Sequence, residues 1–392
     1  MLYNFDQSIS RIGTYCSKHD TKAYNQIPED ALSLWVADMD FETAPCISEA
    51  ILERAKHPIY GYTFAPDSYF NAIIHWMKTR HNWEIEKDWI VTSPSVVTSF
   101  HLVCNTFLEP GDGVLIQSPV YHHFKTSPLA HGMKVVNNPL RLIDGHYEID
   151  FEDFERQVSC PQVKLFILCN PHNPVGRVWT CGELRRMGEL CVKHNVLMIS
   201  DEIHQDLIYK DFTFTSMGSI SDEISDNLIV CTSPGKTFNL PGVSCGNIII
   251  KNPTIRAKFQ ESLTRIAFSN LSPFTISATT AAYTKGGDWA DSLMDYLEAN
   301  KAYVEDFIKE HLPILKVLPC EATYLLWIDC RDLKMTQEDM MHFFIHKCKL
   351  WVHSGTVFGE DGEGFIRMNI ATQRSNLIKA MELLQEGFTS IQ

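Results

Sequence analysis

The sequence contains no uninterrupted apolar run that approaches the length of a membrane span, and residues 1–6 lack the basic region and apolar core of a signal peptide. It also contains no run of lysines or arginines. The formal net charge of −14 argues against a nucleic-acid partner, because phosphates favour basic patches. We therefore expect a soluble cytoplasmic protein that binds neither a membrane nor a nucleic acid.

The twelve cysteines form no C-x-x-C pair, and no cluster of histidines and cysteines has the spacing of a zinc site. Most lie in apolar runs, as Cys169, Cys231, Cys245 and Cys330 do. Small buried thiols of this kind are typical of a protein in a reducing compartment. The pattern favours free thiols in the cytosol and predicts no metal site.

From residue 89 onward, short apolar strands alternate with helices. Strands are expected at 90–92, 114–116, 163–169, 196–200 and from 228 onward, and a helix at 180–194. Near-continuous apolar strands separated by helices are typical of a parallel sheet that is covered on both faces. The sequence therefore predicts an α/β fold.

A chain of 392 residues is too long for one ordinary core, so a second domain is expected. After residues 246–250 the pattern changes to long helices that extend to about residue 311. Strands expected at 324–328 and 365–370 then alternate with helices. This part of the chain predicts a smaller α+β domain.

Lys236 stands directly after a strand, in the stretch Cys231-Thr-Ser-Pro-Gly-Lys-Thr-Phe-Asn239. In open α/β sheets, ligands bind at the carboxyl ends of the strands. A lysine there can form a Schiff base with a carbonyl cofactor if its surroundings leave the amine partly deprotonated. A solvated loop lysine is the plain alternative, and this stretch alone favours that alternative.

Two more polar loops follow expected strands. In residues 169–176, two prolines and a glycine indicate a simple turn, which is the default interpretation, yet Asn173 could donate from its amide to a ligand. Asp201 ends an apolar strand, where a buried carboxylate needs a cationic partner such as a heterocyclic nitrogen. The alternative is a helix N-cap. His204, three residues on, is more often structural than catalytic.

The turn at residues 92–98 opens a helix, whose free N–H groups and hydroxyls could hold a phosphate or serve only as caps. Arg367 lies in an apolar strand, where a guanidinium is costly unless it is paired. A substrate carboxylate and an internal Asp or Glu are about equally suitable partners.

Together these sites resemble the fold-type I pyridoxal-phosphate enzymes of the aminotransferase class I/II superfamily. The motifs 35–41, 170–176, 200–206 and 236–239 are similar to those of its MalY/PatB branch, the cystathionine β-lyase-like C–S lyases, over nearly the whole chain. The resemblance implies a mainly parallel, seven-stranded sheet in a large cofactor-binding domain at 46–286. Residues 1–45 and 287–392 would form the small domain.

By this resemblance, Lys236 would hold pyridoxal 5′-phosphate covalently and act as acid and base at Cα. Asp201 would keep the pyridine nitrogen protonated, while Asn173 would bond to the phenolate oxygen. His204 would stand where aminotransferases place a tyrosine that reaches the same oxygen. Tyr121, which the pattern alone would place in the core, would stack on the ring and take part in catalysis.

The remaining roles also come from the resemblance. The phosphate would be bound by Ser95, Val96, Val97 and Ser233, with Tyr62 reaching across from the neighbouring subunit of a homodimer with shared sites. Arg367 would bind the substrate α-carboxylate, and Asn173, Tyr62, Trp35 and Asp38 would complete the substrate site. The chain departs from the family pattern at Gly235, often serine in this branch, and at Ser244, where many members have arginine. These departures leave the phosphate ligands open.

The function implied is α,β-elimination of cystathionine or cysteine S-conjugates to a thiol, pyruvate and ammonia. Loss of the Cα proton leaves a carbanion that the cofactor absorbs, and a thiolate at Cβ is then expelled. Protonation at the C4′ atom of the cofactor, in place of elimination, would give transamination, so an amino-acid aminotransferase is the nearest alternative. A third possibility is a regulatory protein that binds the cofactor and retains residual lyase activity.

Overall fold

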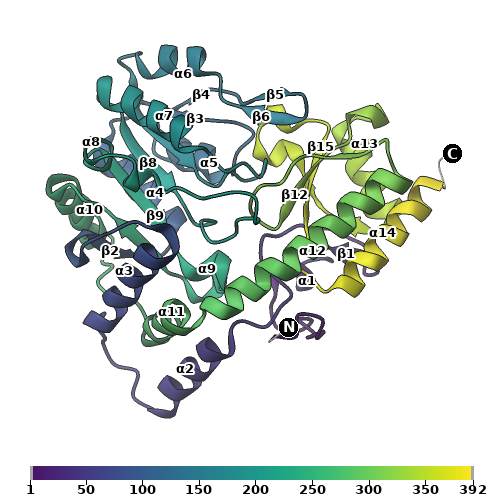
Figure 1. Cartoon of the computed structure of the whole chain (residues 1–392), viewed down its shortest axis with the longest axis horizontal. Helices are drawn as coiled ribbons and strands as arrows, with labels where there is room; N and C mark the ends of the chain where they lie inside the picture. The colour runs from purple at the N-terminus through teal and green to yellow at the C-terminus, as the bar shows by residue number, and fades with distance from the viewer. Residues whose placement is uncertain (1–2, 390–392) are drawn as a thin grey trace.

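The computed structural model describes residues 3–389, which form two lobes around two separate sheets (Figure 1). The larger sheet has seven strands in the order β2-β10-β9-β8-β7-β3-β4. Their bounds are β2 Ile90–Ser93, β3 Gly113–Ile116, β4 Lys134–Asn137, β7 Val163–Cys169, β8 Leu197–Asp201, β9 Leu228–Thr232 and β10 Gly246–Ile249. Only β10 runs antiparallel to its neighbours. The predicted mainly parallel, seven-stranded sheet is confirmed.

Both faces of this sheet are buried, since successive side chains of β7 enter different apolar clusters. Leu165 and Ile167 pack with helices α4, α5 and α10, whereas Phe166 and Leu168 pack with α6 and α7. The helices of this lobe are α2 Pro45–Lys56, α3 Asp67–His81, α4 Val96–Phe107, α5 His123–Ala130, α6 Phe151–Val158, α7 Cys181–Lys193, α8 Asp222–Ser225, α9 Pro234–Thr237, α10 Pro253–Arg265 and α11 Pro273–Lys285. Because helices cover both faces of the sheet, the side chains on both faces of its central strands are buried, which explains the continuous apolar runs in the sequence.

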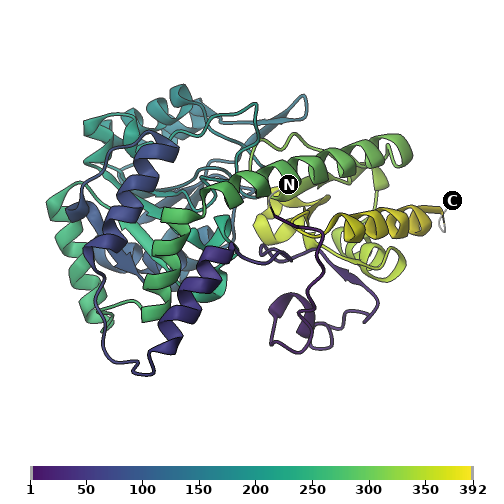
Figure 2. The same ribbon diagram turned by 60° about the horizontal axis from the view of Figure 1, so that its bottom comes forward.

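The smaller lobe contains a four-stranded sheet in the order β11-β12-β15-β14. Its strands are β11 Lys316–Val317, β12 Leu325–Asp329, β14 His353–Ser354 and β15 Phe365–Asn369. Helix α12 (Gly287–His311) runs from the large lobe to this one, where it packs beside α14 (Arg374–Thr389) (Figure 2). Shorter elements complete it, namely α1 Ser17–Asp20, β1 Leu32–Ser33, α13 Gln337–His342 and β13 Leu350–Trp351.

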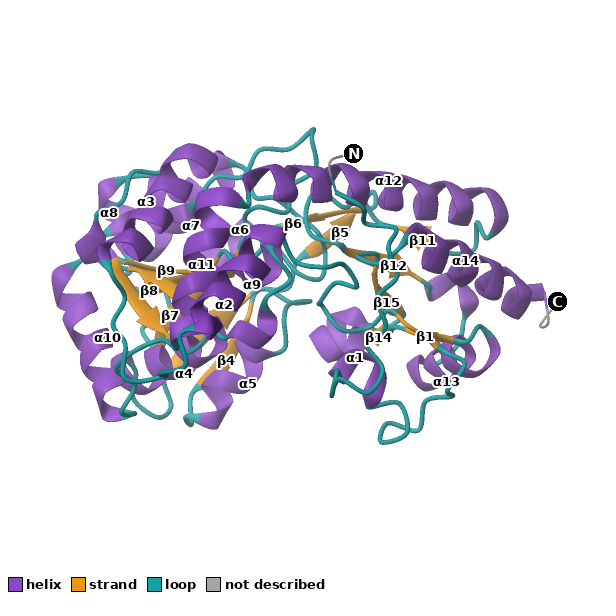
Figure 3. Ribbon diagram, turned by 90° about the horizontal axis from the view of Figure 1, so that it is seen from below, coloured by secondary structure: helices purple, strands orange, loops and turns teal. Residues whose placement is uncertain are grey.

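The N-terminal segment crosses to the small lobe, where β1 pairs in parallel with β13 (Figure 3). Residues 34–40 then run beside β15, since Asn369 donates from its backbone N–H to the carbonyl of Leu34, and Asp40 donates to that of Ala371. The segment thus lies where the two lobes meet. The domain limits 46–286 and 287–392 stay a prediction.

Most expected elements are present within one or two residues of their predicted bounds. The sequence did not reveal β4 or the hairpin of β5 (Arg141–Ile143) and β6 (His146–Glu148), which carry many exposed polar residues and no apolar run. Within residues 3–389, no helix combines the length and apolar character needed to cross a membrane.

Candidate active site

A cavity of about 300 Å³ lies at the carboxyl ends of β7, β8 and β9, against the first turn of α4. The small lobe and the N-terminal segment close its other side. It is lined by Trp35, Val36, Ala37, Val96, Val97, Tyr121, His122, Cys169, Asn173, Asp201, Ile203, His204, Lys236, His353, Val357, Phe358 and Arg367. Nine of the residues singled out in the sequence therefore share one cavity, because parallel strands bring their carboxyl ends together.

Lys236 reaches this cavity from α9, a single helical turn that follows β9. Ser233 starts the turn, and its hydroxyl accepts from the N–H of Gly235 at 3.0 Å. Nζ of Lys236 donates to the main-chain oxygen of Ala37 at 2.6 Å. Burial, reinforced by the positive charge of Arg367, lowers the pKa of Lys236 to about 8. This amine is not the solvated loop lysine that the local sequence favoured.

Asp201 is the last residue of β8 and is 5% exposed. The residues after it form turns, so it does not cap a helix; its Oδ1 accepts from the N–H of Ile203 at 3.2 Å. Burial raises the pKa of the Asp201 carboxyl to about 7, although the Ile203 N–H and the charge of Lys236 oppose the rise. A carboxyl in this state favours a cationic ligand.

His204 and Asn173 lie beside it. The His204 ring packs edge-on against Tyr324, its Nδ1 is buried without a partner among residues 3–389, and burial lowers its pKa well below the usual range. Asn173 accepts through Oδ1 from Arg367 at 3.0 Å. No residue within 3–389 bonds to its Nδ2, which can therefore donate to a ligand.

Arg367 lies in the middle of β15 and is 3% exposed. Its Nη1 donates to Asn173, and its Nη2 donates to the carbonyl of Trp35 at 2.9 Å and to Nδ1 of His353 at 3.3 Å. No carboxylate pairs with it among the described residues, and its Nε is buried without a partner. The internal acid that the sequence left open is therefore not found, and burial lowers the pKa of this guanidinium to about 10.

Sequence reasoning missed Tyr324, just before β12. Its hydroxyl donates to the carbonyl of Ala37 at 3.0 Å, so Ala37 accepts from both Tyr324 and Lys236. Tyr324 is buried in a strand region that reads as ordinary core, and no signal in the sequence distinguishes it. His122 and His353 were missed as well.

Only some of the residues expected to bind the phosphate line the cavity. Val96 and Val97, in the first turn of α4, line the cavity, whereas Ser95 and Ser233 do not. Ser95 caps α4 by accepting from the Thr98 N–H at 3.0 Å. Ser244 is exposed and lines no part of the cavity.

Three further residues have distinct positions. Trp35 lines the cavity, stacked on Trp351 with 4.4 Å between ring centroids. Asp38 lies outside it, with its carboxylate paired to Arg11 at 2.5 Å. Tyr62 is fully exposed in the loop between α2 and α3, and the structure does not bring it to the cavity of its own chain.

Comparison with known proteins settles the family. The sequence profile described as aminotransferase class I and II matches residues 29–384. The chain belongs to the aminotransferase class I and II family.

Among related members of this family, the chain is 41% identical to cystathionine β-lyase PatB of Bacillus subtilis (strain 168) over 374 residues, 95% of this chain and 97% of that one. It is 32% identical to protein MalY of Escherichia coli (strain K12), covering 97% of each chain. The crystal structure of cystalysin from Treponema denticola, which contains a pyridoxal 5′-phosphate cofactor, matches with a TM-score of 0.96 and 35% identity over 100% of each chain. The predicted MalY/PatB resemblance and the pyridoxal-phosphate cofactor are confirmed.

The cavity of this family member fits that cofactor. Asp201 is a buried carboxyl with no ion-pair partner among residues 3–389, which matches a protonated pyridine nitrogen. Lys236 is an amine with a lowered pKa, which matches a covalent link to an aldehyde. Val96 and Val97, in the first turn of α4, line the same cavity, and the free N–H groups of a first helical turn suit a phosphate.

Proposed function

We propose that this chain is a pyridoxal-phosphate-dependent carbon–sulfur β-lyase, which converts cystathionine or a related cysteine thioether and water to a thiol, pyruvate and ammonia. The observation that carries the proposal is Arg367, a buried guanidinium without a carboxylate partner among the described residues, in the same cavity as Lys236 and Asp201. The likeness to PatB and cystalysin supports it.

Arg367 binds the α-carboxylate of the amino acid. Its Nη1 and Nη2 are held by Asn173 and by the carbonyl of Trp35, which fixes the plane of the guanidinium. A hydrogen bond to a charged group is worth about 1.5–3 kcal/mol, and a bidentate carboxylate makes two. This anchor orients the substrate so that one Cα–H bond faces Lys236.

Lys236 is the acid and base at Cα. With its pKa at about 8, roughly a tenth of the amine is neutral at pH 7, against about 0.03% for a lysine at the ordinary value of 10.5. The neutral amine accepts the Cα proton, and the electron pair left at Cα expels the thiolate from Cβ. The resulting ammonium can give that proton to the departing thiolate, which leaves as the thiol.

The remaining groups hold the cofactor. When bound, pyridoxal phosphate withdraws electron density from Cα of the attached amino acid. Asp201 would hold its ring nitrogen in the cationic form, Nδ2 of Asn173 would donate to its ring oxygen, and Tyr121 would lie against its face. The N–H groups of Ser95, Val96 and Val97 and the hydroxyl of Ser233 are the proposed phosphate ligands.

The test is incubation of the purified protein with cystathionine, followed by assays for pyruvate and free thiol. Both products in equal amounts are expected. Amino transfer to a keto acid without release of pyruvate would identify an aminotransferase. Neither activity, in protein that contains the cofactor, would favour a regulatory protein.

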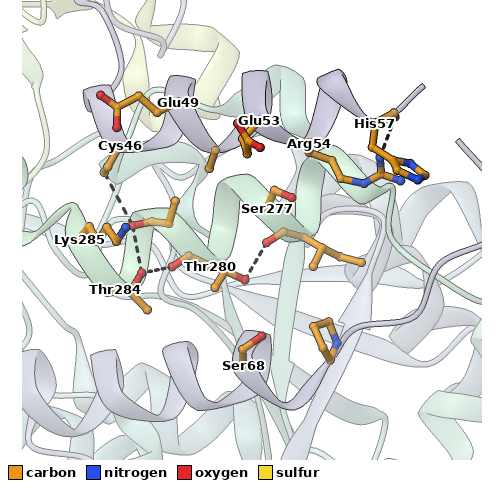
Figure 4. Close-up of a pocket in the computed structure, with 14 residues that line it drawn as sticks. Cys46, Glu49, Glu53, Arg54, His57, Ser68, Ser277, Thr280, Thr284 and Lys285 are labelled. Carbon is orange, nitrogen blue, oxygen red and sulfur yellow. Dashed lines mark hydrogen bonds between the residues drawn. The ribbon is translucent and has the colours of Figure 1, made fainter. Parts of the chain in front are cut away.

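We also propose a homodimer with shared active sites. A cavity of about 890 Å³ lies between α2, α11 and the start of α3, and it is lined by residues of all three helices, among them Cys46 of α2, Thr280 and Thr284 of α11 and Ser68 of α3 (Figure 4). The adjoining loop projects from the body of the chain (Figure 1) and exposes the large apolar side chains of Ile59, Tyr60, Tyr62 and Phe64. Contiguous exposed apolar surface of this kind supports a protein interface.

In this dimer, Tyr62 of each chain would reach the phosphate end of the other chain's cavity. Sedimentation should give twice the chain mass. Chains with Lys236→Ala and chains with Tyr62→Ala should each be weakly active alone and regain activity when co-expressed, because one of the two sites in the mixed dimer is then intact. A monomer, or no gain on co-expression, would contradict shared sites.

We infer a cytoplasmic location. The support is that all twelve cysteines are free thiols, most of them buried.

A further inference from the structure

The wall of the active-site cavity next to Arg367 carries two imidazoles that the proposed chemistry does not use. His122 stands just before α5, and His353 begins β14. Both line the cavity, together with the apolar side chains of Trp35, Val357 and Phe358. The His122 ring packs edge-on against Tyr121, with 4.8 Å between ring centroids, and His353 contacts Arg367.

Both imidazoles are neutral at physiological pH. Burial, with His123 and Arg367, lowers the pKa of His122 to about 4; burial, with Arg367 and His122, lowers that of His353 to about 3. A neutral imidazole beside a guanidinium avoids charge repulsion, and it still offers one N–H donor.

The position of each proton follows from the hydrogen bonds. Nδ1 of His353 accepts from Arg367 at 3.3 Å, so its Nε2 carries the proton. Nδ1 of His122 is buried and has no partner among residues 3–389. An unpaired N–H there would be costly, which assigns the proton of His122 to Nε2 as well. No other described residue bonds to either Nε2, so both donors are free for a ligand.

Within the proposed lyase function, we propose that His122 is a specificity-determining residue that donates from Nε2 to a second carboxylate, at the far end of the thioether side chain. Lys236 and Arg367 are the only Lys or Arg residues among the lining residues, and Asp201 is the only acid. Because Arg367 is assigned to the α-carboxylate and Lys236 to the cofactor, a second carboxylate would be bound by the neutral imidazole donors of this wall. The apolar wall of Trp35, Val357 and Phe358 suits the carbon chain and sulfur between the two carboxylates, and His353 adds a second donor.

A matched pair of substrates tests this inference: S-(2-carboxyethyl)cysteine and S-propylcysteine, which are similar in size and differ in the terminal carboxylate. The wild-type holoenzyme should prefer the carboxylate. His122→Phe should lower kcat/KM for S-(2-carboxyethyl)cysteine by about tenfold to 100-fold, the range of one hydrogen bond to a charged group. The change should appear mainly in KM, since the far carboxylate takes no part in bond breaking, and S-propylcysteine should be affected much less.

Two variants serve as controls. His122→Gln, whose amide can place a donor near the position of Nε2, should retain the preference. His75→Phe removes an exposed imidazole on α3, which does not line the cavity, and should leave the ratio of the two kcat/KM values unchanged. Cofactor absorbance per chain checks that each variant is folded and loaded.

Equal losses on both substrates in His122→Phe, or no preference in the wild type, would overturn this inference and leave the proposed lyase function intact. A loaded wild-type enzyme that cleaves neither thioether would overturn the proposed function, and the inference with it.

Discussion

Replacing Asp201 by asparagine should have opposite effects on the protein with and without its cofactor. The carboxyl ionises near pH 3.8 when exposed and near pH 7 in the folded, cofactor-free chain. Because the folded state binds the extra proton, stability falls as pH rises through the window between these two values. At pH 8 the buried carboxylate costs on the order of 4 kcal/mol of folding free energy.

The Asp201→Asn protein lacks this titration. Its free energy of unfolding, relative to that of the wild type, should rise by about 3 kcal/mol between pH 5 and pH 8 when both proteins are free of cofactor. Urea unfolding at the two pH values measures the change, and any constant effect of the substitution on packing cancels. Asp306→Asn, on the exposed surface of α12, provides the control and should show no such change.

The same substitution, which stabilises the cofactor-free protein at high pH, should weaken its binding of the cofactor. A carboxylate next to a pyridinium shifts its pKa by about 1–3 units, so Asp201→Asn should weaken cofactor affinity by roughly 10- to 1000-fold. Titration of the cofactor-free protein with pyridoxal phosphate, followed by absorbance, gives the affinity. A difference in unfolding free energy that does not vary with pH would refute the electrostatic reasoning at Asp201.

Four further outcomes are expected. Lys236→Ala should abolish the yellow absorbance of the covalently bound cofactor near neutral pH; an unchanged spectrum would count against Lys236 as the attachment point. The rate at which cofactor-free wild type captures the cofactor should fall about tenfold per pH unit below pH 8, because only the neutral amine reacts; a flat profile in stopped-flow absorbance would contradict the lowered pKa. Arg367→Ala should raise the KM for the amino acid by at least about 30-fold, the effect of breaking a buried charge pair, with cofactor content unchanged; a cofactor-free variant would contradict this role. Tyr324→Phe should lower the free energy of unfolding by about 1 kcal/mol through the lost bond to Ala37, without changing the spectrum of bound cofactor.

The parallel sheet could be predicted from the sequence because strands buried on both faces appear as near-continuous apolar runs, as in residues 163–169. It also marked Lys236, Asp201 and Asn173 as candidates near the carboxyl ends of apolar strands, and the structure brings all three to one cavity because those ends meet. It could not decide between a substrate and an internal acid for Arg367. That choice depends on which side chains surround β15 after folding, and Asn173 and Trp35 come from distant parts of the chain.

Other features were beyond local patterns for similar reasons. Asp38 belongs to a motif shared with the family, yet its carboxylate pairs with Arg11, 27 residues earlier. Tyr324 and His122 have no neighbours in sequence that mark them, because their surroundings are assembled from both lobes. The antiparallel direction of β10 follows from its short connection to β9 through α9, which a list of apolar runs does not encode.

Residues 35–37 contact Lys236, Tyr324 and Arg367 through main-chain oxygens. The carbonyl oxygen of Trp35 accepts a hydrogen bond from Arg367, and that of Ala37 accepts one each from Lys236 and Tyr324. No exchange of side chain at position 37 can delete an acceptor that belongs to the peptide backbone. Alanine scanning would therefore undervalue this stretch, whereas replacing a single amide by an ester, or shifting the segment by one inserted residue, would disturb the two cationic groups at once.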